Sequence, residues 1–382
     1  MEKIKIYMSR ILLKVFWLLP LNQKQIFFSS YEGKQYSCNP KTMYLYIKNK
    51  DIMHNYKYIY EYNDEIIPDD LKENNTTVVK HNSIKYIFYI MTSKYLITNS
   101  GISCCFPLRK SQINVNTWHG GGAYKKVGYA TSNKIHNGNL SRLEIGSKQT
   151  TFLLSSSKTF SKIMSKSTKI DSEKIVEIGM PRNDILFDIN RMKIVNQEVR
   201  KKLLIAMDDY VVLYAPTYRG NSGSDNYNNI SFDVKKIKKE IGKKVNKNVK
   251  FLFRAHYFND SIYLDRDIIN VGGYPDMQDL LIVADTLITD YSSSIWDYSF
   301  TKKPCFLYVD DLDEYNINRG FESPIEKWPG IVCKNEDELI YHINNFDNII
   351  YQNKIKQHLN DLKNCEKGIA SSLLYNILGL DN

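Results

Sequence analysis

The sequence predicts an α/β protein with two domains, each built around a parallel sheet. Its 382 residues exceed what one ordinary hydrophobic core organises and are enough for two. Hydrophobic residues make up 43% and charged residues 25% of the chain, which is typical of folded globular proteins. Short apolar segments that end in turn residues alternate with helical segments, and the alternation starts afresh in the second half. Such repeated alternation predicts parallel sheets covered by helices.

The first half carries the first series of elements. A helix opens at Asn39-Pro40 and runs to about Asn49, because proline fits the first turn of a helix. A second helix is predicted over Ile84–Met91. The predicted strands are the short apolar runs Gln25–Ser30, Tyr56–Tyr62, Thr77–Lys80, Lys94–Asn99, Ile113–Thr117, Phe152–Ser156 and Ile175–Ile178.

The second half repeats the pattern after the polar, charged stretch Asp188–Lys202. We therefore expect an N-terminal domain over residues 23–190 and a C-terminal domain over residues 200–382. Ligands are expected in the cleft that the domains face, at the carboxyl ends of the strands. The predicted strands are Val211–Ala215, Val249–Arg254, Ile268–Val271, Thr286–Thr289 and Pro304–Val309. The predicted helices are Val234–Lys244, Met277–Ala284, Ser294–Phe300 and Glu336–Asn344.

The first 22 residues form a basic and apolar segment. Arg10 and Lys14 interrupt its apolar run, which is therefore too short to cross a bilayer. No small-residue cleavage site follows, so we expect no secretory signal. Phe16 and Trp17 beside basic residues favour an amphipathic helix over residues 1–22 that lies in the membrane interface. A first helix packed into the core is the alternative.

The net charge limits the kinds of partner to expect, and the cysteine spacing indicates the redox compartment. The formal net charge of +10 favours anionic partners such as phospholipid headgroups or phosphate-bearing substrates. No zinc-finger, homeodomain or RNP-like signature accompanies this charge, so we expect no nucleic-acid partner. The six cysteines show no Cys-x-x-Cys spacing, which predicts a reduced, cytoplasmic chain without a structural disulfide or metal site.

The loop after the fifth predicted strand carries the best catalytic candidate. His119 lies at the strand's carboxyl end, where catalytic groups belong in this architecture. A neutral imidazole accepts a proton from an attacking hydroxyl near neutral pH. Gly120 and Gly121 allow a sharp turn, while Lys125 and Lys126 can offset phosphate charge in an acceptor loop. A structural histidine in a tight loop is the alternative.

A run of hydroxyl residues follows the strand Thr286–Thr289 and leads into a helix. The free N–H groups and partial positive charge at a helix N-terminus attract anions, and serine hydroxyls add further donors. Ordinary N-capping, the alternative, needs only one Ser or Asp. The run therefore predicts a diphosphate site formed by Thr289, Asp290, Ser292, Ser293, Ser294 and Asp297.

Two further strand ends carry polar or cationic side chains. Arg254 and His256 occupy alternate positions, so both face one side and can donate hydrogen bonds to a pyrophosphate. A protonated His256 would stabilise the departing nucleotide as a second catalytic residue. Arg182 and Asn183 follow a Gly-x-Pro turn and are candidates for holding a phosphate. Asp184 either joins them or caps the next helix.

In their order and spacing, these segments resemble the CDP-glycerol glycerophosphotransferase family of teichoic acid synthesis. The resemblance covers about residues 25–325, which makes chance a poor explanation. The matching motifs are Gly33-Lys34-Gln35-Tyr36-Ser37, Asn39-Pro40, Trp118-His119-Gly120, Gly179-x-Pro181-Arg182-Asn183-Asp184, Tyr214-Ala215-Pro216-Thr217-Tyr218-Arg219, Arg254-x-His256, Thr289-Asp290-Tyr291-Ser292-Ser293, Lys303-Pro304 and Arg319-Gly320-Phe321.

The resemblance implies a GT-B-like fold, with two Rossmann-like domains facing a central cleft, the first for the acceptor and the second for the CDP-donor. It implies that His119 is the base and that His256 contacts the donor phosphates. It also implies that Ser292 and Ser293 bind the pyrophosphate, with Thr217 among the donor-binding residues. The implied reaction moves glycerol phosphate from CDP-glycerol to a hydroxyl of a lipid-linked teichoic acid or capsule-type polymer and releases CMP. The implied setting is the cytoplasmic face of the bacterial membrane, as a peripheral protein with neither metal nor cofactor.

The loop after His119 departs from the family pattern. The family commonly has Trp-His-Gly-Thr-Pro-Leu-Lys-Lys, whereas this chain has one residue more before Lys125 and Lys126. Because this loop neighbours the acceptor, the acceptor and the polyol stay open. The alternatives are a CDP-ribitol or other CDP-polyol phosphotransferase, a GT-B glycosyltransferase that uses a nucleotide-sugar, and a non-catalytic protein that binds membrane or polymer. The oligomeric state, a homo-oligomer included, stays open as well.

Overall fold

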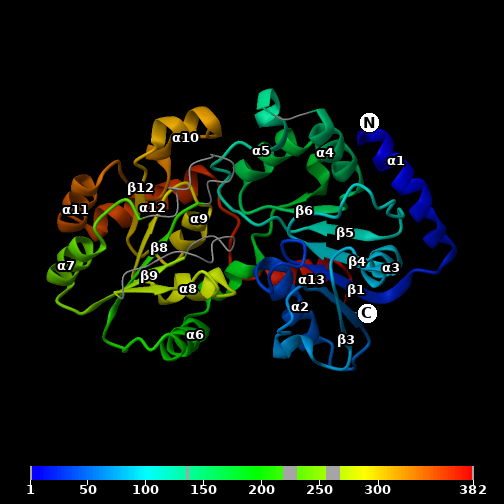
Figure 1. The fold of residues 1–382 in the computed structure, drawn as a ribbon, viewed down its shortest axis with the longest axis horizontal. Helices are drawn as coiled ribbons and strands as arrows, with labels where there is room; N and C mark the ends of the chain where they lie inside the picture. The colour runs from blue at the N-terminus through cyan, green and yellow to red at the C-terminus, as the bar shows by residue number, and fades with distance from the viewer. Residues whose placement is uncertain (1, 135–136, 218–229, 255–266, 381–382) are drawn as a thin grey trace. The chain divides into compact units, whose positions relative to one another are not determined.

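A computed structural model describes residues 2–134, 137–217, 230–254 and 267–380 (Figure 1). The chain forms two compact units. The first comprises Met1–Gly121, Lys126–Asp184 and Lys363–Asn382, and the second comprises Gly122–Lys125 and Ile185–Leu362. Each unit holds one sheet whose described ladders are all parallel, which confirms the predicted α/β class with two parallel sheets.

The sheet of the first unit has the strand order β3-β2-β1-β4-β5-β6-β7. In chain order these strands are β1 Asn22–Ser29, β2 Lys57–Glu61, β3 Thr76–Val79, β4 Ser93–Thr98, β5 Ile113–Asn116, β6 Phe152–Leu154 and β7 Ile175–Val176. The chain builds from β1 outwards to β3 and then returns to place β4 on the other side of β1. The boundary between β1 and β4 is therefore the topological switch point, where ligands of open α/β sheets bind.

Helices cover both faces of this sheet because its central strand is apolar on both sides. Phe27 of β1 packs with Tyr86 of α3 (Ile84–Thr92). Its neighbour Phe28 contacts Tyr44 of α2 (Cys38–Lys50), with ring centroids 5.6 Å apart. A strand buried on both faces needs such a continuous apolar run. The unit's other α-helices in the described residues are α1 Glu2–Leu13, α4 Asn137–Gln149, α5 Lys158–Thr168 and α13 Ala370–Ile377.

The N-terminal segment is helical and mostly exposed. Helix α1 spans Glu2–Leu13 and continues as a 3₁₀ turn over Lys14–Leu18. Ile6 alone among its described residues is buried, at 3% exposure, which argues against a helix packed into the core. Other apolar side chains of α1 are 59–72% exposed, namely Ile4, Met8, Ile11 and Leu12. Of the helices that the structure describes, none is long and apolar enough to span a bilayer.

The sheet of the second unit has the strand order β10-β9-β8-β11-β12-β13, so its switch point lies between β8 and β11. The strands are β8 Tyr210–Ala215, β9 Val249–Phe253, β10 Ile268–Asn270, β11 Thr286–Thr289, β12 Cys305–Tyr308 and β13 Ile331–Cys333. The helices are α6 Ile189–Lys202, α7 Val234–Val245, α8 Met277–Val283, α9 Ser294–Ser299, α10 Leu312–Asn318, α11 Glu336–Asn344 and α12 Asn348–Asp361. Alternate residues of β8 enter two separate core clusters, one on each face of the sheet.

The structure divides the chain differently from the layout expected from composition. The polar stretch Asp188–Lys202, expected to separate the domains, is helix α6 with its cap, and it belongs to the second unit. Asp188 caps this helix by accepting a hydrogen bond from the Arg191 N–H at 3.0 Å. Val199 and Arg200 are buried, and Arg200 pairs with Asp285 at 3.4 Å, while the other charged residues of the helix are exposed. Because most of its residues are polar or charged, a surface helix of this kind cannot be distinguished from a linker by composition alone.

The C-terminal residues Lys363–Asn382, expected in the second domain, belong instead to the first unit. Asp184 fixes their helix, because its carboxylate accepts hydrogen bonds from the backbone N–H groups of Ala370 and Ser371, both at 2.8 Å. Asp184 is therefore a helix cap, but of α13 rather than of the helix that follows it in sequence. Residues 1–22, predicted as an amphipathic segment that precedes the first domain, are likewise part of the first unit.

The residue added to the loop after His119 has a structural consequence. Residues Gly122–Lys125 belong to the second unit, and Tyr124 is 3% exposed within its core. The Tyr124 hydroxyl donates to Nε2 of His358 at 3.0 Å, and Nδ1 of His358 donates to the carbonyl oxygen of Lys327 at 2.8 Å. Gly122 has φ +77°, and a Cβ there would collide with the Tyr124 ring, so only glycine fits.

We expect stability to fall as the pH is lowered from about 6.5 to about 4, because of His358. Burial lowers the pKa of His358 from 6.5 to about 4. Above pH 6.5 both folded and unfolded chains hold the ring neutral, and the buried contacts keep their full value. Below it the unfolded chain binds the proton first, which favours unfolding by about 1.4 kcal/mol per pH unit and roughly 3 kcal/mol in all.

The measurement is the midpoint of urea unfolding between pH 7.5 and pH 4.5, for the wild type and for His358→Gln. Glutamine keeps a donor and an acceptor but does not titrate in this window. The wild type should lose stability more steeply than the variant. Equal slopes would show that His358 is not the group responsible.

Candidate functional site

His119 lies in a tight turn beyond the carboxyl end of β5. The preceding residue, Trp118, has φ +56°, a conformation that costs a non-glycine residue roughly 1–2 kcal/mol. The turn is held by a hydrogen bond from the Trp118 N–H to the Asn116 side-chain oxygen at 3.0 Å. The Trp118 ring stacks on the imidazole, with centroids 5.0 Å apart and planes 18° from parallel. The side chain of His119 is exposed.

The orientation of the imidazole decides which of its nitrogens is basic. Nδ1 of His119 lies 2.9 Å from the backbone carbonyl oxygen of Asn99. A carbonyl oxygen only accepts hydrogen bonds, so Nδ1 carries the proton in this contact. The lone pair of the neutral ring is then on Nε2, which is the nitrogen that can accept a proton.

Asn99 brings this imidazole to the switch point of the first sheet. It directly follows β4, and its side-chain oxygen accepts a hydrogen bond from the backbone N–H of Tyr31 at 2.8 Å. Tyr31 in turn follows β1, and its ring centroid lies 5.7 Å from that of His119. Residues after β1, β4 and β5 therefore meet around the histidine, where this architecture places ligands.

Asn39 at the start of α2 is a positioning residue that the sequence analysis did not assign to the site. It is fully buried. Its Nδ2 donates to the carbonyl oxygens of Thr117 at 3.2 Å and Trp118 at 3.0 Å, and its Oδ1 accepts from the Arg182 N–H at 3.0 Å. One amide thus joins the turn that carries His119 to the segment after β7. The signal was present in the Asn39-Pro40 motif, but sequence alone gives it only as a helix start.

Arg182 and Asn183 lie in the first unit with His119, and not with the Thr289–Ser293 loop with which they were grouped as donor-binding residues. Arg182 is 6% exposed, and its Nη1 contacts the Cys38 sulfur at 3.3 Å. Asn183 is fully buried and donates to Oε1 of Glu366 at 3.1 Å. These contacts tie the segment after β7 to α2 and to the C-terminal residues.

In the second unit, Thr217 and Asp290 meet across the switch point. Thr217 follows β8 and Asp290 follows β11. The backbone N–H and the hydroxyl of Thr217 both donate to Oδ1 of Asp290, at 2.8 Å and 2.6 Å. Two segments that the sequence analysis marked separately therefore form one arrangement.

The hydroxyl residues of this loop divide by exposure. Ser292 and Ser293 are half-buried, whereas Thr289 is fully buried and donates to the Ala215 carbonyl oxygen at 2.7 Å. The hydroxyl of Ser294 donates to that of Ser292 at 2.9 Å. Helix α9 is six residues long and begins at Ser294, as predicted, so Ser292 and Ser293 lie directly before its N-terminus. Ser292 and Ser293 are thus the hydroxyls that a ligand can reach most directly.

The remaining predicted residues are distributed over both units. Asp297 is 3% exposed and accepts from Nε2 of Gln278 at 3.0 Å. Arg254 directly follows β9, next to β8 at the same edge of the sheet, and is half-buried. His256 lies outside the described residues. Of the predicted acceptor loop, Gly120, Gly121 and Lys126 belong to the first unit and Lys125 to the second.

Comparison with known proteins shows which enzyme family has this arrangement. Residues 11–378 match the family model described as CDP-glycerol:poly(glycerophosphate) glycerophosphotransferase. The chain belongs to this family. Because the match covers nearly the whole chain, it spans both units and all the motifs described above. It confirms the family resemblance and identifies a transferase of the glycerophosphotransferase class.

Relatives of this glycerophosphotransferase agree with the assignment. The chain is 29% identical over 382 residues to a teichoic acid poly(glycerol phosphate) polymerase of Bacillus spizizenii, covering 94% of this chain and 93% of the relative. It is 29% identical over 347 residues to a teichoic acid glycerol-phosphate transferase of Staphylococcus aureus, covering 85% of each. A solved structure of the wall teichoic acid polymerase TagF superposes with a TM-score of 0.84 at 25% identity, covering 100% of this chain and 97% of that one. The GT-B-like fold class is therefore confirmed.

Proposed function

We propose that this chain transfers glycerol phosphate from CDP-glycerol to a terminal hydroxyl of a lipid-linked teichoic acid or related polymer, with His119 as general base. The observation that carries the proposal is the bond from His119 Nδ1 to the Asn99 carbonyl oxygen, 2.9 Å long, in a chain of this family. It leaves Nε2 as the basic nitrogen at the switch point of the sheet. The family description and the two relatives named above support glycerol phosphate as the transferred unit. Other relatives are named for ribitol phosphate, which makes CDP-ribitol the alternative donor to test.

The proposed step is a single displacement at phosphorus. Nε2 of His119 takes the proton of the acceptor hydroxyl as its oxygen attacks the phosphorus that bears glycerol. The bond from that phosphorus to the bridging oxygen breaks, and CMP leaves with the bridging oxygen. The acceptor gains a glycerol phosphate through a new phosphodiester bond. Phosphoryl transfer depends chiefly on positioning and on stabilising charge, so hydroxyl, amide and cationic groups suit it.

The second unit is assigned the CDP-donor. The exposed parts of Ser292 and Ser293 supply hydroxyl donors for the diphosphate, and Arg254 supplies positive charge at the same strand ends. The Thr217–Asp290 pair fixes the two loops that flank them. We further propose that His256 contacts the donor phosphates, as the family resemblance implies. Lys125 and Lys126 are proposed to offset the charge of the phosphorylated acceptor.

The setting that we propose is the cytoplasmic face of the bacterial membrane, with the chain bound peripherally. The exposed apolar residues of α1 and the net charge of +10 both suit an anionic lipid surface. A membrane-linked acceptor would then be presented in the plane where the enzyme lies.

A donor panel tests the proposal. Purified protein is incubated with a lipid-linked acceptor and CDP-glycerol, CDP-ribitol or a UDP-sugar, and the mass of the acceptor is followed. We expect the acceptor to gain one or more glycerol phosphate units with CDP-glycerol alone. Gain of ribitol phosphate would move the assignment to the other polyol, and gain of a sugar would overturn it.

Loss of the two loop hydroxyls should weaken donor binding without disturbing the fold. A hydrogen bond to a charged group contributes about 1.5–3 kcal/mol, so Ser292→Ala with Ser293→Ala should raise the KM for CDP-glycerol at least roughly ten-fold. Initial rates of CMP release against donor concentration measure this. Ser323→Ala, a half-buried serine of the same unit, is the control and should keep its KM. Equal KM values in both variants would remove these serines from the donor site.

A further inference from the structure

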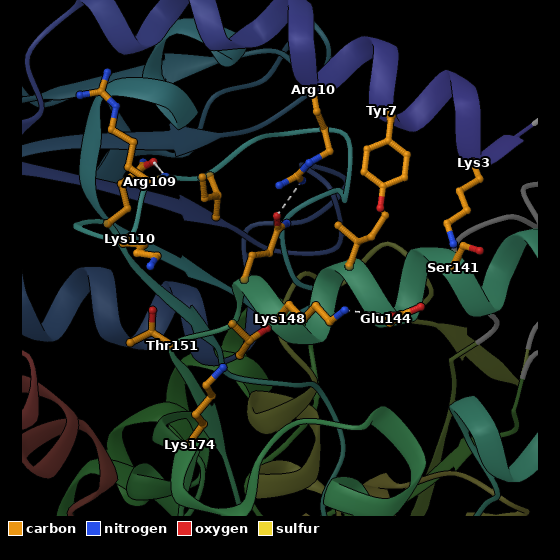
Figure 2. A pocket seen from close by; sticks show the side chains of 15 residues that line it. Lys3, Tyr7, Arg10, Arg109, Lys110, Ser141, Glu144, Lys148, Thr151 and Lys174 are labelled. Carbon is orange, nitrogen blue, oxygen red and sulfur yellow. Dashed lines mark hydrogen bonds and ion pairs between the residues drawn. The ribbon is translucent and has the colours of Figure 1, made fainter.

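A basic pocket lies in the first unit, beside helix α1 (Figure 2). Its volume is about 620 Å³, within the range of about 300–1,000 Å³ usual for small-molecule sites. Its walls come from α1, from α4 and from the segments that lead into β5, β6 and β7. Six basic residues line it and Glu144 is the one acidic residue. The basic residues are Lys3, Arg10, Arg109, Lys110, Lys148 and Lys174.

This pocket is separate from the site around His119. Gln112 precedes β5, Thr151 precedes β6 and Lys174 precedes β7, so the lining lies at the amino ends of these parallel strands. His119 lies beyond the carboxyl end of β5. The two places are thus at opposite edges of one sheet, and the catalytic proposal makes no use of the pocket.

Two arginines build the walls. Nη1 of Arg10 donates to the carbonyl oxygens of Cys104 at 2.7 Å and Phe106 at 2.8 Å, which fixes α1 to the loop before β5. Nη2 of Arg109 donates to the carbonyl oxygens of Phe16 and Leu19, both at 2.6 Å. Both guanidinium groups therefore hold the N-terminal helix in place.

Two of the four lining lysines, Lys3 and Lys110, supply charge that no described protein group pairs with. Lys148 pairs with Glu144 at 2.8 Å, which uses the one acidic residue of the lining. Lys3 and Lys110 form no hydrogen bond or ion pair with any residue in the described part of the chain, and Lys174 reaches Asp171 only at 3.6 Å. Figure 2 shows Lys3, Lys110 and Lys174 entering from three sides of the pocket. Like charges around one cavity repel each other unless an anion lies between them.

The position of the pocket on α1 indicates where such an anion comes from. Lys3, Tyr7 and Arg10 are spaced as one face of a helix and line the pocket. The exposed apolar strip Ile4, Met8 and Ile11 follows each of them by one residue, and so lies about 100° further around the helix. An amphipathic helix with this layout lies in a membrane interface with its apolar strip in the acyl boundary. The basic pocket would then open at the depth of the headgroups.

We propose that this pocket binds the phosphate of an anionic phospholipid headgroup, held by Lys3, Lys110 and Lys174, while the apolar strip of α1 enters the lipid. The proposal deepens the membrane partner of the proposed function and rests on it. Phosphodiesters of the polymer itself have the same charge, and they are the competing occupant that the experiment must separate from lipid.

The test is co-sedimentation of the full chain with vesicles of phosphatidylcholine alone or with added phosphatidylglycerol. The variant carries Lys3→Gln, Lys110→Gln and Lys174→Gln together. Each basic residue near an anionic surface contributes about five-fold in affinity, so binding to the anionic vesicles should fall roughly 100-fold. The matched control carries Lys80→Gln, Lys239→Gln and Lys247→Gln, three exposed lysines outside the pocket with the same loss of charge. It should lose about two-fold or less at physiological salt.

Three results would overturn the proposal. Equal losses in both triple variants would show that only total charge matters. Equal binding of the wild type to neutral and anionic vesicles would show that binding does not depend on the headgroup charge. Displacement of the protein from anionic vesicles by soluble poly(glycerol phosphate), at matched phosphate concentration, would assign the pocket to the polymer.

Turnover separates this inference from the proposed reaction. With CDP-glycerol and a short, soluble acceptor analogue, the pocket variant should keep the wild-type rate of CMP release, because its lysines lie at the opposite edge of the sheet. A wild type that binds anionic vesicles but releases no CMP would leave the pocket standing and remove the proposed function. A pocket variant that loses soluble turnover would instead mark a structural defect, and it would contradict the separation of the pocket from the catalytic site.

Discussion

Replacing His119 by alanine should lower kcat for CMP release by about 10²- to 10⁴-fold, the usual contribution of a positioned general base. The bond from Nδ1 to the Asn99 carbonyl oxygen fixes the tautomer, so the variant loses the one nitrogen that the structure orients as a base. The imidazole is exposed and lies outside the hydrophobic core, and the fold should therefore be unaffected. The rate is measured with saturating CDP-glycerol and acceptor.

Donor binding should survive this substitution, because the donor is assigned to the second unit. The rise in melting temperature that CDP-glycerol produces should match that of the wild type. His54→Ala is a matched control, since His54 is another exposed histidine of the first unit and lies before β2, at the amino ends of the strands and not at the carboxyl ends where His119 lies. It should keep the wild-type kcat. A fully active His119→Ala would remove His119 from the mechanism.

The second large effect is expected at Asn39, which touches no substrate in this account. Asn39→Ala removes four side-chain hydrogen bonds that hold the turn before His119 and the segment after β7, the longest of them to the Met180 sulfur at 3.7 Å. A displacement of about 1 Å in a catalytic group can cost about 100-fold in rate, and we expect a fall of that order in kcat. The KM for CDP-glycerol should change little.

Loss of stability alone has to be separated from loss of positioning. Asn114 is a buried asparagine in β5, and its Nδ2 donates to the Gln149 carbonyl oxygen at 3.0 Å, away from the turn that carries His119. Asn114→Ala and Asn39→Ala should each lose about 1–3 kcal/mol of stability in urea unfolding. Of these two variants, only Asn39→Ala should have a lowered kcat. Parallel losses of kcat in both variants would reduce Asn39 to a structural residue.

Much of the fold could be predicted because buried parallel strands leave a strong signal. Thr286–Thr289 and helix Glu336–Asn344 were predicted with both ends correct, since turn residues or a cap bound each apolar run. Helix α6 was taken for a linker because its buried side is narrow and its exposed side charged. The return of Lys363–Asn382 to the first unit depends on Asp184, nearly two hundred residues away in the chain, and no local pattern reveals it.

The candidate site shows the same division. His119, Ser292 and Ser293 could be proposed because each follows a predicted strand. Asn39 could not, because its role requires residues 39, 117 and 182 to meet, and only the folded sheet brings them together. The structure explains the loop that departs from the family pattern. Its Tyr124 is a core residue of the second unit and forms a hydrogen bond with His358.

The central claim is that the acceptor attacks phosphorus and that CMP leaves. The nucleotide released from CDP-glycerol, quantified together with the mass gained by the lipid-linked acceptor, tests it most directly. Attack at phosphorus predicts one CMP for each glycerol phosphate gained. Release of CDP with gain of glycerol alone would mean attack at carbon and would contradict the account.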